Sequence, residues 1–189
     1  EPVDNEYTVI ETAEALSVSA TNEDDGGTLS YQWYSDTDSD AIGGTAIAGA
    51  TDATYTPAID AVGTFYYYCV VTNSKTGFEP KSITSQAAKV TVTKATLTKA
   101  DVTLDGLEST YDLYEQHVSV VALPAALEGQ YVTVGYMKNE YLLPNVPSSA
   151  GEYTVVLSVK DSPNYEDVDL YYDMVINVAD VTVHTMPGV

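Results

Sequence analysis

The sequence predicts an all-β chain that folds as two β-sandwich domains in tandem, and three observations lead to this prediction. Valine, threonine and tyrosine favour pleated sheets, and tyrosine alone occurs 16 times among the 189 residues. Several short segments alternate between apolar and polar residues, which is the pattern of a strand with one buried face. Clusters of glycine, asparagine, aspartate and serine separate these segments, as is typical of sandwiches built from many short strands.

The alternation also predicts where the strands lie. It places the clearest strands at residues 15–20, 29–34, 63–71, 132–136, 151–159 and 168–178. Helical periodicity is scarce, because the best helix-like run, residues 122–127, is interrupted by Pro124. We therefore expect almost no helix.

An internal correspondence divides the chain. The segment GTFYYYCVV at residues 63–71 can be laid over GEYTVVLSV at residues 151–159, and in both cases a proline-containing loop precedes and a polar turn follows. Self-similarity of this kind indicates two copies of one architecture. We expect one domain over residues 1–95 and a second over 96–180, leaving 181–189 as a tail or the start of a following segment.

The first half resembles the bacterial immunoglobulin-like repeats of secreted and cell-surface proteins over roughly residues 5–94. The residues that carry this resemblance are LSYQWY at 29–34, GATDATYTP at 49–57 and GTFYYYCVVTN at 63–73. The resemblance implies an immunoglobulin-like sandwich in which Trp33 is the core tryptophan and Tyr67 is a candidate for the tyrosine-corner residue.

The second half resembles the bacterial surface repeats called MBG domains, over roughly residues 96–180. The matching segments are VTVGY at 132–136, VPSSAGEYTVVLSV at 146–159, SPNY at 162–165 and MVINVA at 174–179. Together the two resemblances imply two immunoglobulin-like sandwiches on the surface of a bacterium or in a secreted protein. They also imply other domains of a larger surface protein as partners, and they bring no catalytic residues.

The single cysteine, Cys69, is expected in the core. In immunoglobulin domains a cysteine at this place pairs with one on strand B, but Val18 stands at the partner position, so we expect an apolar contact between the two side chains. Cys69 corresponds to Leu157 in the overlay. The predicted core residues are Val18, Trp33, Tyr67, Cys69, Tyr153 and Leu157.

The charge of the chain excludes two classes of partner. There are 28 acidic residues and seven basic ones, which gives a net charge of −21. Nucleic acids and anionic membrane surfaces are bound through lysine and arginine, so neither is an expected partner. No apolar run approaches the roughly 18 residues that a membrane-spanning helix needs, so we expect no membrane insertion of this segment.

No motif for catalysis or cofactor binding is present in the sequence. The two histidines, His117 and His184, do not stand in a metal-ligand spacing, and no phosphate-binding or nucleophile loop occurs. We expect no enzyme and no cofactor. The remaining catalytic alternative is a hydrolase fragment, because so many acidic residues always offer carboxylate pairs.

An acidic turn offers weak candidates for a metal site. Asp36, Asp38 and Asp40 alternate as at the start of a calcium loop, but Ala41 replaces the turn glycine and Ile47 replaces the bidentate glutamate. We expect a solvated hairpin tip without tightly bound calcium. The alternative is a calcium site of another type that adds Asp24 or Asp25.

The exposed aromatics suggest a binding surface. If Trp33 and Tyr67 point inward, alternation turns Gln32, Tyr34, Tyr66 and Tyr68 outward on two neighbouring strands, where tyrosines can stack on sugars or contact a protein. The alternative is that they form cross-strand pairs that stabilise the sheet. We expect a structural spacer, to which weak adhesion can add, and the alternative is a carbohydrate- or host-protein-binding module that uses this face.

Overall fold

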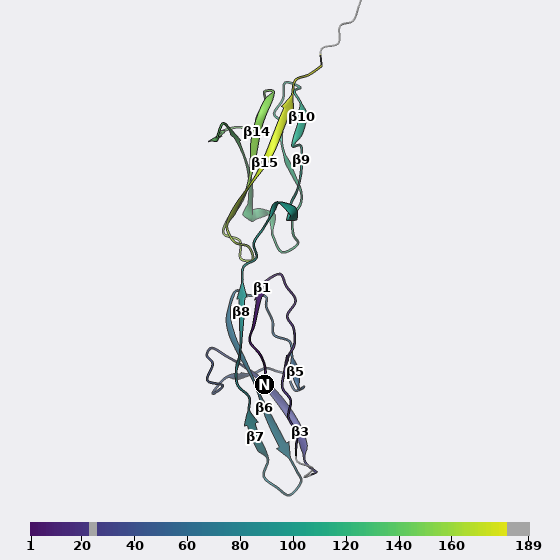
Figure 1. Ribbon diagram of the computed structural model, residues 1–189, viewed down its shortest axis with the longest axis vertical. Helices are drawn as coiled ribbons and strands as arrows, with labels where there is room; N and C mark the ends of the chain where they lie inside the picture. Colours follow the sequence, from purple (N-terminus) through teal and green to yellow (C-terminus); the bar gives the residue numbers. More distant parts are fainter. Residues whose placement is uncertain (23–25, 181–189) are drawn as a thin grey trace, which may run out of the picture. The chain divides into compact units, whose positions relative to one another are not determined.

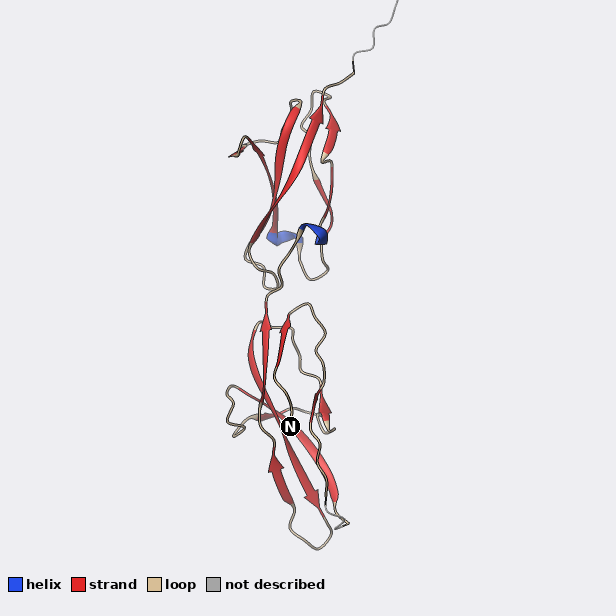
Figure 2. Cartoon of the chain, viewed as in Figure 1, coloured by secondary structure: helices blue, strands red, loops and turns tan. Residues whose placement is uncertain are grey.

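The computed structural model describes residues 1–22 and 26–180, which fold as two compact units divided between Ala95 and Thr96. We call them the first and the second domain. Almost all regular structure is β, and the helical segments among the described residues are two 3₁₀ turns, η1 (Lys99–Asp101) and η2 (Gly129–Tyr131). Figure 2 shows this composition. The predicted all-β fold class, with two tandem β-sandwich domains, is confirmed.

In the first domain one large sheet carries most of the structure (Figure 1). Its strands lie in the order β1-β8-β6-β3-β4, and β7 extends the other half of β6. A small second sheet pairs β2 with β5. The bounds are β1 (Asn5–Thr8), β2 (Leu16–Ser17), β3 (Thr28–Asp36), β4 (Thr45–Ala46), β5 (Thr54–Tyr55), β6 (Gly63–Ser74), β7 (Lys81–Thr84) and β8 (Ala88–Thr93).

The second domain has an equivalent large sheet in the order β10-β15-β14-β12-β13, and a small sheet that pairs β9 with β11. The bounds are β9 (Thr103–Asp105), β10 (Glu108–Thr110), β11 (Ser119–Ala122), β12 (Val132–Lys138), β13 (Tyr141–Leu142), β14 (Gly151–Val159) and β15 (Val168–Asn177). In both domains the two central strands of the large sheet are antiparallel, and a short early strand lies parallel to the last one.

The two cores fill equivalent places with different residues. Trp33 of β3 lies opposite Cys69 of β6, and Val134 of β12 lies opposite Leu157 of β14. A large residue faces a small one in the first domain, and two medium-sized residues face each other in the second. All six residues predicted for the core are buried, and Val18 and Cys69 belong to one hydrophobic cluster.

The strand predicted at residues 15–20 is much shorter in the structure. β2 consists of Leu16 and Ser17, followed by one further hydrogen bond from the Val18 N–H to the Ala53 carbonyl oxygen. Its partner β5 is equally short, and among the described residues no strand pairs with residues 19–22. This short second sheet leaves part of the large sheet uncovered.

Candidate functional site

The outward face of β3 and β6 is the binding surface that the sequence predicts. Tyr34 lies directly opposite Tyr68, which places both side chains on the same face of the sheet. Their rings are stacked, with 5.1 Å between centroids and 3° between planes. Tyr66 lies on this face as well, opposite Asp36 on one side and Lys89 on the other.

The expected exposure of Tyr68 is wrong, because only 4% of this residue is accessible to solvent. Its hydroxyl accepts a hydrogen bond of 3.0 Å from the Gly44 N–H. Gly44, the last residue of the connection from β3 to β4, lies against the ring, and we call this contact the cover over Tyr68. The face that alternation turned outward is thus partly an internal surface of the domain.

Gly44 is required for this cover. A Cβ atom at Gly44 would lie 2.8 Å from the Ser35 carbonyl oxygen and 2.9 Å from Cε1 of Tyr68. Backbone and a stacked ring cannot move aside as the end of a flexible chain can, so a side chain at residue 44 would push the connection away from the sheet.

Gln32 also has a structural role. Its Nε2 donates hydrogen bonds of 2.8 Å to the carbonyl oxygens of Trp33 and Ile47, which ties the strand to the segment after β4. Of the four predicted binding residues, Tyr34 and Tyr66 remain partly exposed. The side chains of these two residues make no hydrogen bond to another described residue. The structure therefore does not present the four as one exposed patch.

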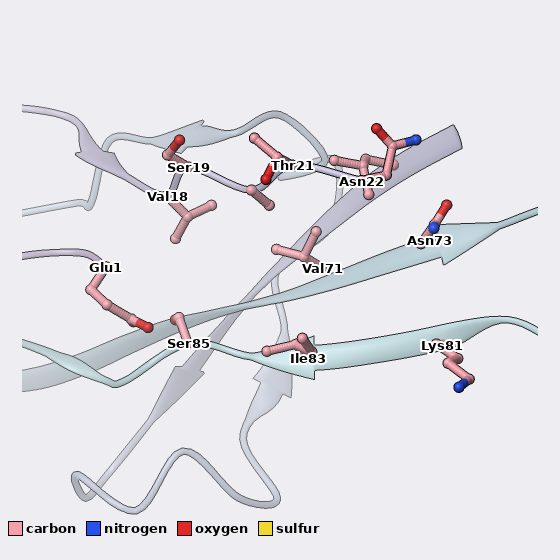
Figure 3. A pocket seen from close by; sticks show the side chains of 12 residues that line it. Glu1, Val18, Ser19, Thr21, Asn22, Val71, Asn73, Lys81, Ile83 and Ser85 are labelled. Atoms are coloured by element: carbon pink, nitrogen blue, oxygen red, sulfur yellow. The ribbon is translucent and has the colours of Figure 1, made fainter. Parts of the chain in front are cut away.

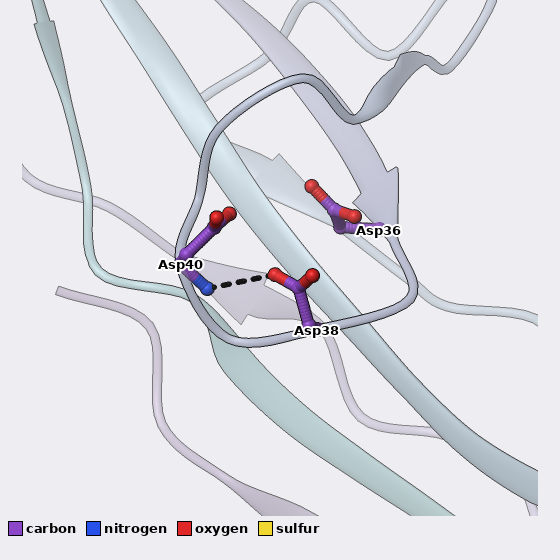
Figure 4. A group of neighbouring side chains, drawn as sticks. All are labelled: Asp36, Asp38 and Asp40. Carbon is purple, nitrogen blue, oxygen red and sulfur yellow. Dashed lines mark hydrogen bonds between the residues drawn. The ribbon is translucent and has the colours of Figure 1, made fainter.

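The acidic turn brings three carboxylates together (Figure 4). Oxygen atoms of Asp36, Asp38 and Asp40 lie within 4.8 Å of one another. Each carboxylate accepts a backbone hydrogen bond inside the turn: Asp36 from the Thr37 N–H, Asp38 from the Asp40 N–H and Asp40 from the Ile42 N–H. These local bonds explain the alternation as turn chemistry. Asp24 and Asp25, the additional calcium candidates, lie outside the described residues.

Cys69 lies in an environment that keeps the thiol unreactive. The residue is fully buried and makes no disulfide. Burial raises the pKa of the Cys69 thiol, which disfavours the nucleophilic thiolate. Its N–H donates to Oγ of Ser85 at 2.9 Å, and the Ser85 N–H donates back to its carbonyl oxygen. Ser85 thereby satisfies the backbone of β6 at the break between β7 and β8.

A groove of about 430 Å³ opens in the first domain where the second sheet ends (Figure 3). Val18 lies on one wall, and Val71 of β6 and Ile83 of β7 lie across from it on the large sheet. Ile83 is 77% exposed, although it shares the inward face with Val71. The lining residues are Glu1, Val18, Ser19, Ala20, Thr21, Asn22, Leu29, Val71, Asn73, Lys81, Ile83 and Ser85.

Sequence reasoning missed this groove. Among the described residues, the lining contains one carboxylate side chain, Glu1, and one ammonium side chain, Lys81, and it contains neither histidine nor cysteine. These residues do not form a pair of nucleophile and base. The signal in the sequence was Ile83, an apolar residue at an inward position. Ile83 is exposed because β2 and β5 are short and do not extend over it.

Polar residues of the second domain stabilise local structure. Tyr153 makes the hydrogen bond of a tyrosine corner, from its hydroxyl to the Ser149 carbonyl oxygen at 2.8 Å. For Tyr67, the predicted corner residue, the structure has no hydrogen bond from the hydroxyl to another described residue. Hydrogen bonds from Thr98 lower the pKa of Asp101, and bonds from Ser158 and then Lys160 lower the pKa of Asp169. His184 lies outside the described residues.

Two family models match the chain. A model described as an MBG domain matches residues 100–170, and a model described as a domain of unknown function (DUF8696) matches residues 3–94. The predicted MBG resemblance is confirmed for residues 100–170. The immunoglobulin-like repeat family stays a prediction for the first half.

Two solved structures of bacterial proteins match the chain at low sequence identity. One is the surface glycan-binding protein SGBP-B of the Bacteroides ovatus mixed-linkage glucan utilization locus, in complex with a mixed-linkage heptasaccharide. It is 14% identical with a TM-score of 0.34, and the match covers 95% of this chain and 44% of that one. The other comprises the fibronectin(III)-like modules of Clostridium thermocellum CbhA, 13% identical with a TM-score of 0.32, covering 99% of this chain and 96% of that one.

The chain thus spans less than half of the length of the Bacteroides protein. No curated protein sequence matches it. Among the described residues, no helix is long and apolar enough to cross a membrane.

Proposed function

We propose that this chain is a non-catalytic structural module of a bacterial cell-surface or secreted protein, which spaces or presents other domains of that protein. The observation that carries the proposal is the repetition of one sheet order in two successive domains, each around its own core. Domains with separate cores can follow one another along a chain and add length without depending on a shared site.

The family match supports the proposed setting. MBG domains are the bacterial surface repeats that the second half resembles in sequence, and the MBG model matches residues 100–170. A net charge of −21 favours solubility and long-range repulsion between chains, which suits a segment exposed to solvent.

The chemistry of the side chains supports a role without catalysis. The carboxylates with shifted pKa values, Asp101 and Asp169, owe the shift to hydrogen bonds from neighbouring residues that hold a turn or a strand pair. The pKa of Cys69 is raised, the direction opposite to that of a nucleophilic cysteine. Perturbed groups gathered in one cleft are the mark of an active site, and these three belong to separate places.

A second candidate function is binding of a glycan or a host protein at the outer face of β3 and β6. The partial exposure of Tyr34 and Tyr66 favours it, since exposed tyrosines offer rigid amphipathic surface. The burial of Tyr68 reduces the aromatic area available for such binding.

A screen of the intact chain against glycan and protein arrays tests the two candidates. The spacer proposal expects no saturable binding at micromolar concentrations. Binding that is lost in Tyr66→Ala and kept in Tyr171→Ala, a matched exposed tyrosine of the second domain, would overturn it in favour of the binding module.

A further inference from the structure

The first domain joins the two ends of its chain through a parallel strand pair. β1, its first strand, lies beside β8, its last, with Asn5 to Thr8 in register with Val90 to Thr93. The Val9 N–H extends the ladder by a bond of 3.0 Å to the Thr93 carbonyl oxygen.

Side chains lengthen this ladder toward the N-terminus. The Asp4 carboxylate accepts a hydrogen bond of 2.8 Å from the Lys89 N–H, and the Glu1 carboxylate accepts one of 2.8 Å from the Gln86 N–H. The N-terminal segment is therefore attached to the last strand from residue 1 to residue 9.

The second domain repeats the arrangement with β10 and β15. Glu108 to Thr110 are in register with Val175 to Asn177, again in parallel. Two flanking bonds extend this ladder: the Val175 N–H donates to the Leu107 carbonyl oxygen at 2.9 Å, and the Tyr111 N–H donates to the Asn177 carbonyl oxygen at 2.8 Å.

The parallel direction decides how such a pair responds to tension. When a chain is pulled at its two ends, the early strand is drawn toward its own start and the last strand toward its own end. Because the strands are parallel, these directions are opposite, so the strands must slide past each other and all ladder bonds carry load together. An antiparallel pair would be pulled from one end, and its bonds would break one after another.

We propose that the β1–β8 and β10–β15 pairs are mechanical shear clamps, which let each domain bear tension applied along the chain. The biological use of these clamps rests on the proposed spacer function. A spacer that presents another domain under flow or traction has to keep its length, and each domain in a series carries the same force.

Force spectroscopy on single molecules tests the clamp in two pulling directions. The intact chain is first held by its N- and C-termini. In a second experiment the first domain is held by the N-terminus and by Thr76→Cys, in the loop between β6 and β7 at the end of the sheet where β1 begins (Figure 1). Cys69 is buried and does not compete for the thiol handle.

Pulling between the N-terminus and residue 76 separates β1 from β8 one hydrogen bond at a time. We expect the unfolding force of the first domain to fall severalfold relative to the terminal direction, because the load is no longer shared along the ladder. Equal forces in the two directions would overturn the clamp.

Proline variants test the clamp bonds themselves. Val9→Pro removes one donor of the first clamp and Tyr111→Pro one of the second, and the preceding residues, Thr8 and Thr110, are in strands, a conformation that proline tolerates before it. Val9→Ala and Tyr111→Ala are the matched controls, since they lose the side chain and keep the N–H.

Under terminal load we expect each proline variant to unfold about tenfold faster than its alanine control, the effect of losing one backbone hydrogen bond from the barrier. Equal rates for proline and alanine would overturn the assignment of these bonds to the clamp. Low unfolding forces under terminal load, together with no binding on the glycan and protein arrays, would refute the clamp and leave the spacer role. High unfolding forces together with specific binding would refute the spacer-only role and leave the clamp.

Discussion

The two domains differ most in the connection that follows the first central strand of the large sheet. In the second domain, Asn139 and Glu140 connect β12 to β13, both with positive φ (49° and 68°), the geometry of a tight type I′ hairpin turn. In the first domain, residues 37–44 connect β3 to β4, and Gly44 at their end lies against the ring of Tyr68. The same strand order thus carries a short turn in one copy and a cover in the other.

The outer faces of the two large sheets differ as a result. The cover in the first domain buries Tyr68 beneath Gly44. On the equivalent face of the second domain Val156, the counterpart of Tyr68, is also largely buried at 9% exposure, but its neighbours remain exposed: Leu142, beside Gly135, by 70% and Tyr171, opposite Val156, by 49%. Strand alternation tells which way a side chain points, and the connections decide whether it reaches solvent.

The largest expected effect tests the difference between the cores. Trp33→Ala should lower the free energy of unfolding of the first domain by about 3–5 kcal/mol, because it empties the centre of the core and removes the bond from its indole N–H to the Asp52 carbonyl oxygen. Calorimetry on the intact chain measures this. Val134→Ala, at the equivalent position, should cost clearly less, and equal costs would contradict the large–small pairing of Trp33 with Cys69.

The partner positions should show the reverse order. Leu157→Ala should destabilise the second domain by about 2–5 kcal/mol, and Cys69→Ala the first by about 1–2 kcal/mol, since the sizes of the removed groups differ. Chemical denaturation of each variant gives the two values. A cysteine variant as costly as the leucine variant would show that the thiol does more than fill space.

The cover over Tyr68 can be tested at its glycine. Gly44→Ala should cost about 1–3 kcal/mol through overpacking and should expose the Tyr34–Tyr68 stack. Gly135→Ala, on the outer face of the large sheet of the second domain, is the matched control. Its Cβ would lie 3.4 Å from Cδ1 of Leu142, the end of a flexible side chain, so little loss is expected. Near-ultraviolet circular dichroism follows the tyrosines, and an unchanged spectrum for Gly44→Ala would refute the cover.

The hydrogen bond of the tyrosine corner should add about 1 kcal/mol to the free energy of unfolding of the second domain, and the first domain has no equivalent bond from Tyr67 to another described residue. Tyr153→Phe removes the bond to Ser149 and should cost that amount at neutral pH, whereas Tyr67→Phe should cost little. Burial, followed by the charges of Tyr55 and Asp60, raises the pKa of Tyr67 above its usual value near 10. The folded state therefore holds this proton more tightly than the unfolded state does.

The stabilisation from the Tyr67 proton is complete below pH 10 and is lost as the pH rises through the folded value. Tyr67→Phe should remove part of the alkaline destabilisation of the first domain. Denaturation curves between about pH 8 and pH 11, the range around the usual tyrosine pKa, measure this effect. Identical alkaline slopes for the variant and the natural sequence would contradict the assignment.

The smallest expected effect concerns the acidic turn. Calcium titrated into the intact chain should give no micromolar binding heat, because Ala41 and Ile47 stand where a calcium loop has its turn glycine and its bidentate glutamate. A calcium site that disappears in Asp38→Ala would show that the carboxylates of the turn bind the ion. Asp105→Ala, in the second domain, is the control for loss of charge alone.

Local pattern predicted the fold class and failed where distant segments meet. Trp33 and Cys69 could be assigned to the core because their faces follow from alternation within single strands. The overlay of Gly63 on Gly151 identified equivalent strands, both of which begin at that glycine. The burial of Tyr68 depends on how residues 37–44 bring Gly44 against its ring, and the groove depends on where β2 and β5 stop pairing. Neither is encoded in the periodicity of one segment.

The contact of Trp33 with the strand that carries Cys69 has a practical consequence. The chain has one tryptophan and one cysteine, and they lie opposite each other, fully buried, in the first domain. Indole fluorescence and thiol labelling therefore both report on the same part of the core of the first domain, while the second domain contributes to neither signal. The opening of the first domain can therefore be followed in the intact chain through its own tryptophan and cysteine, without any substitution.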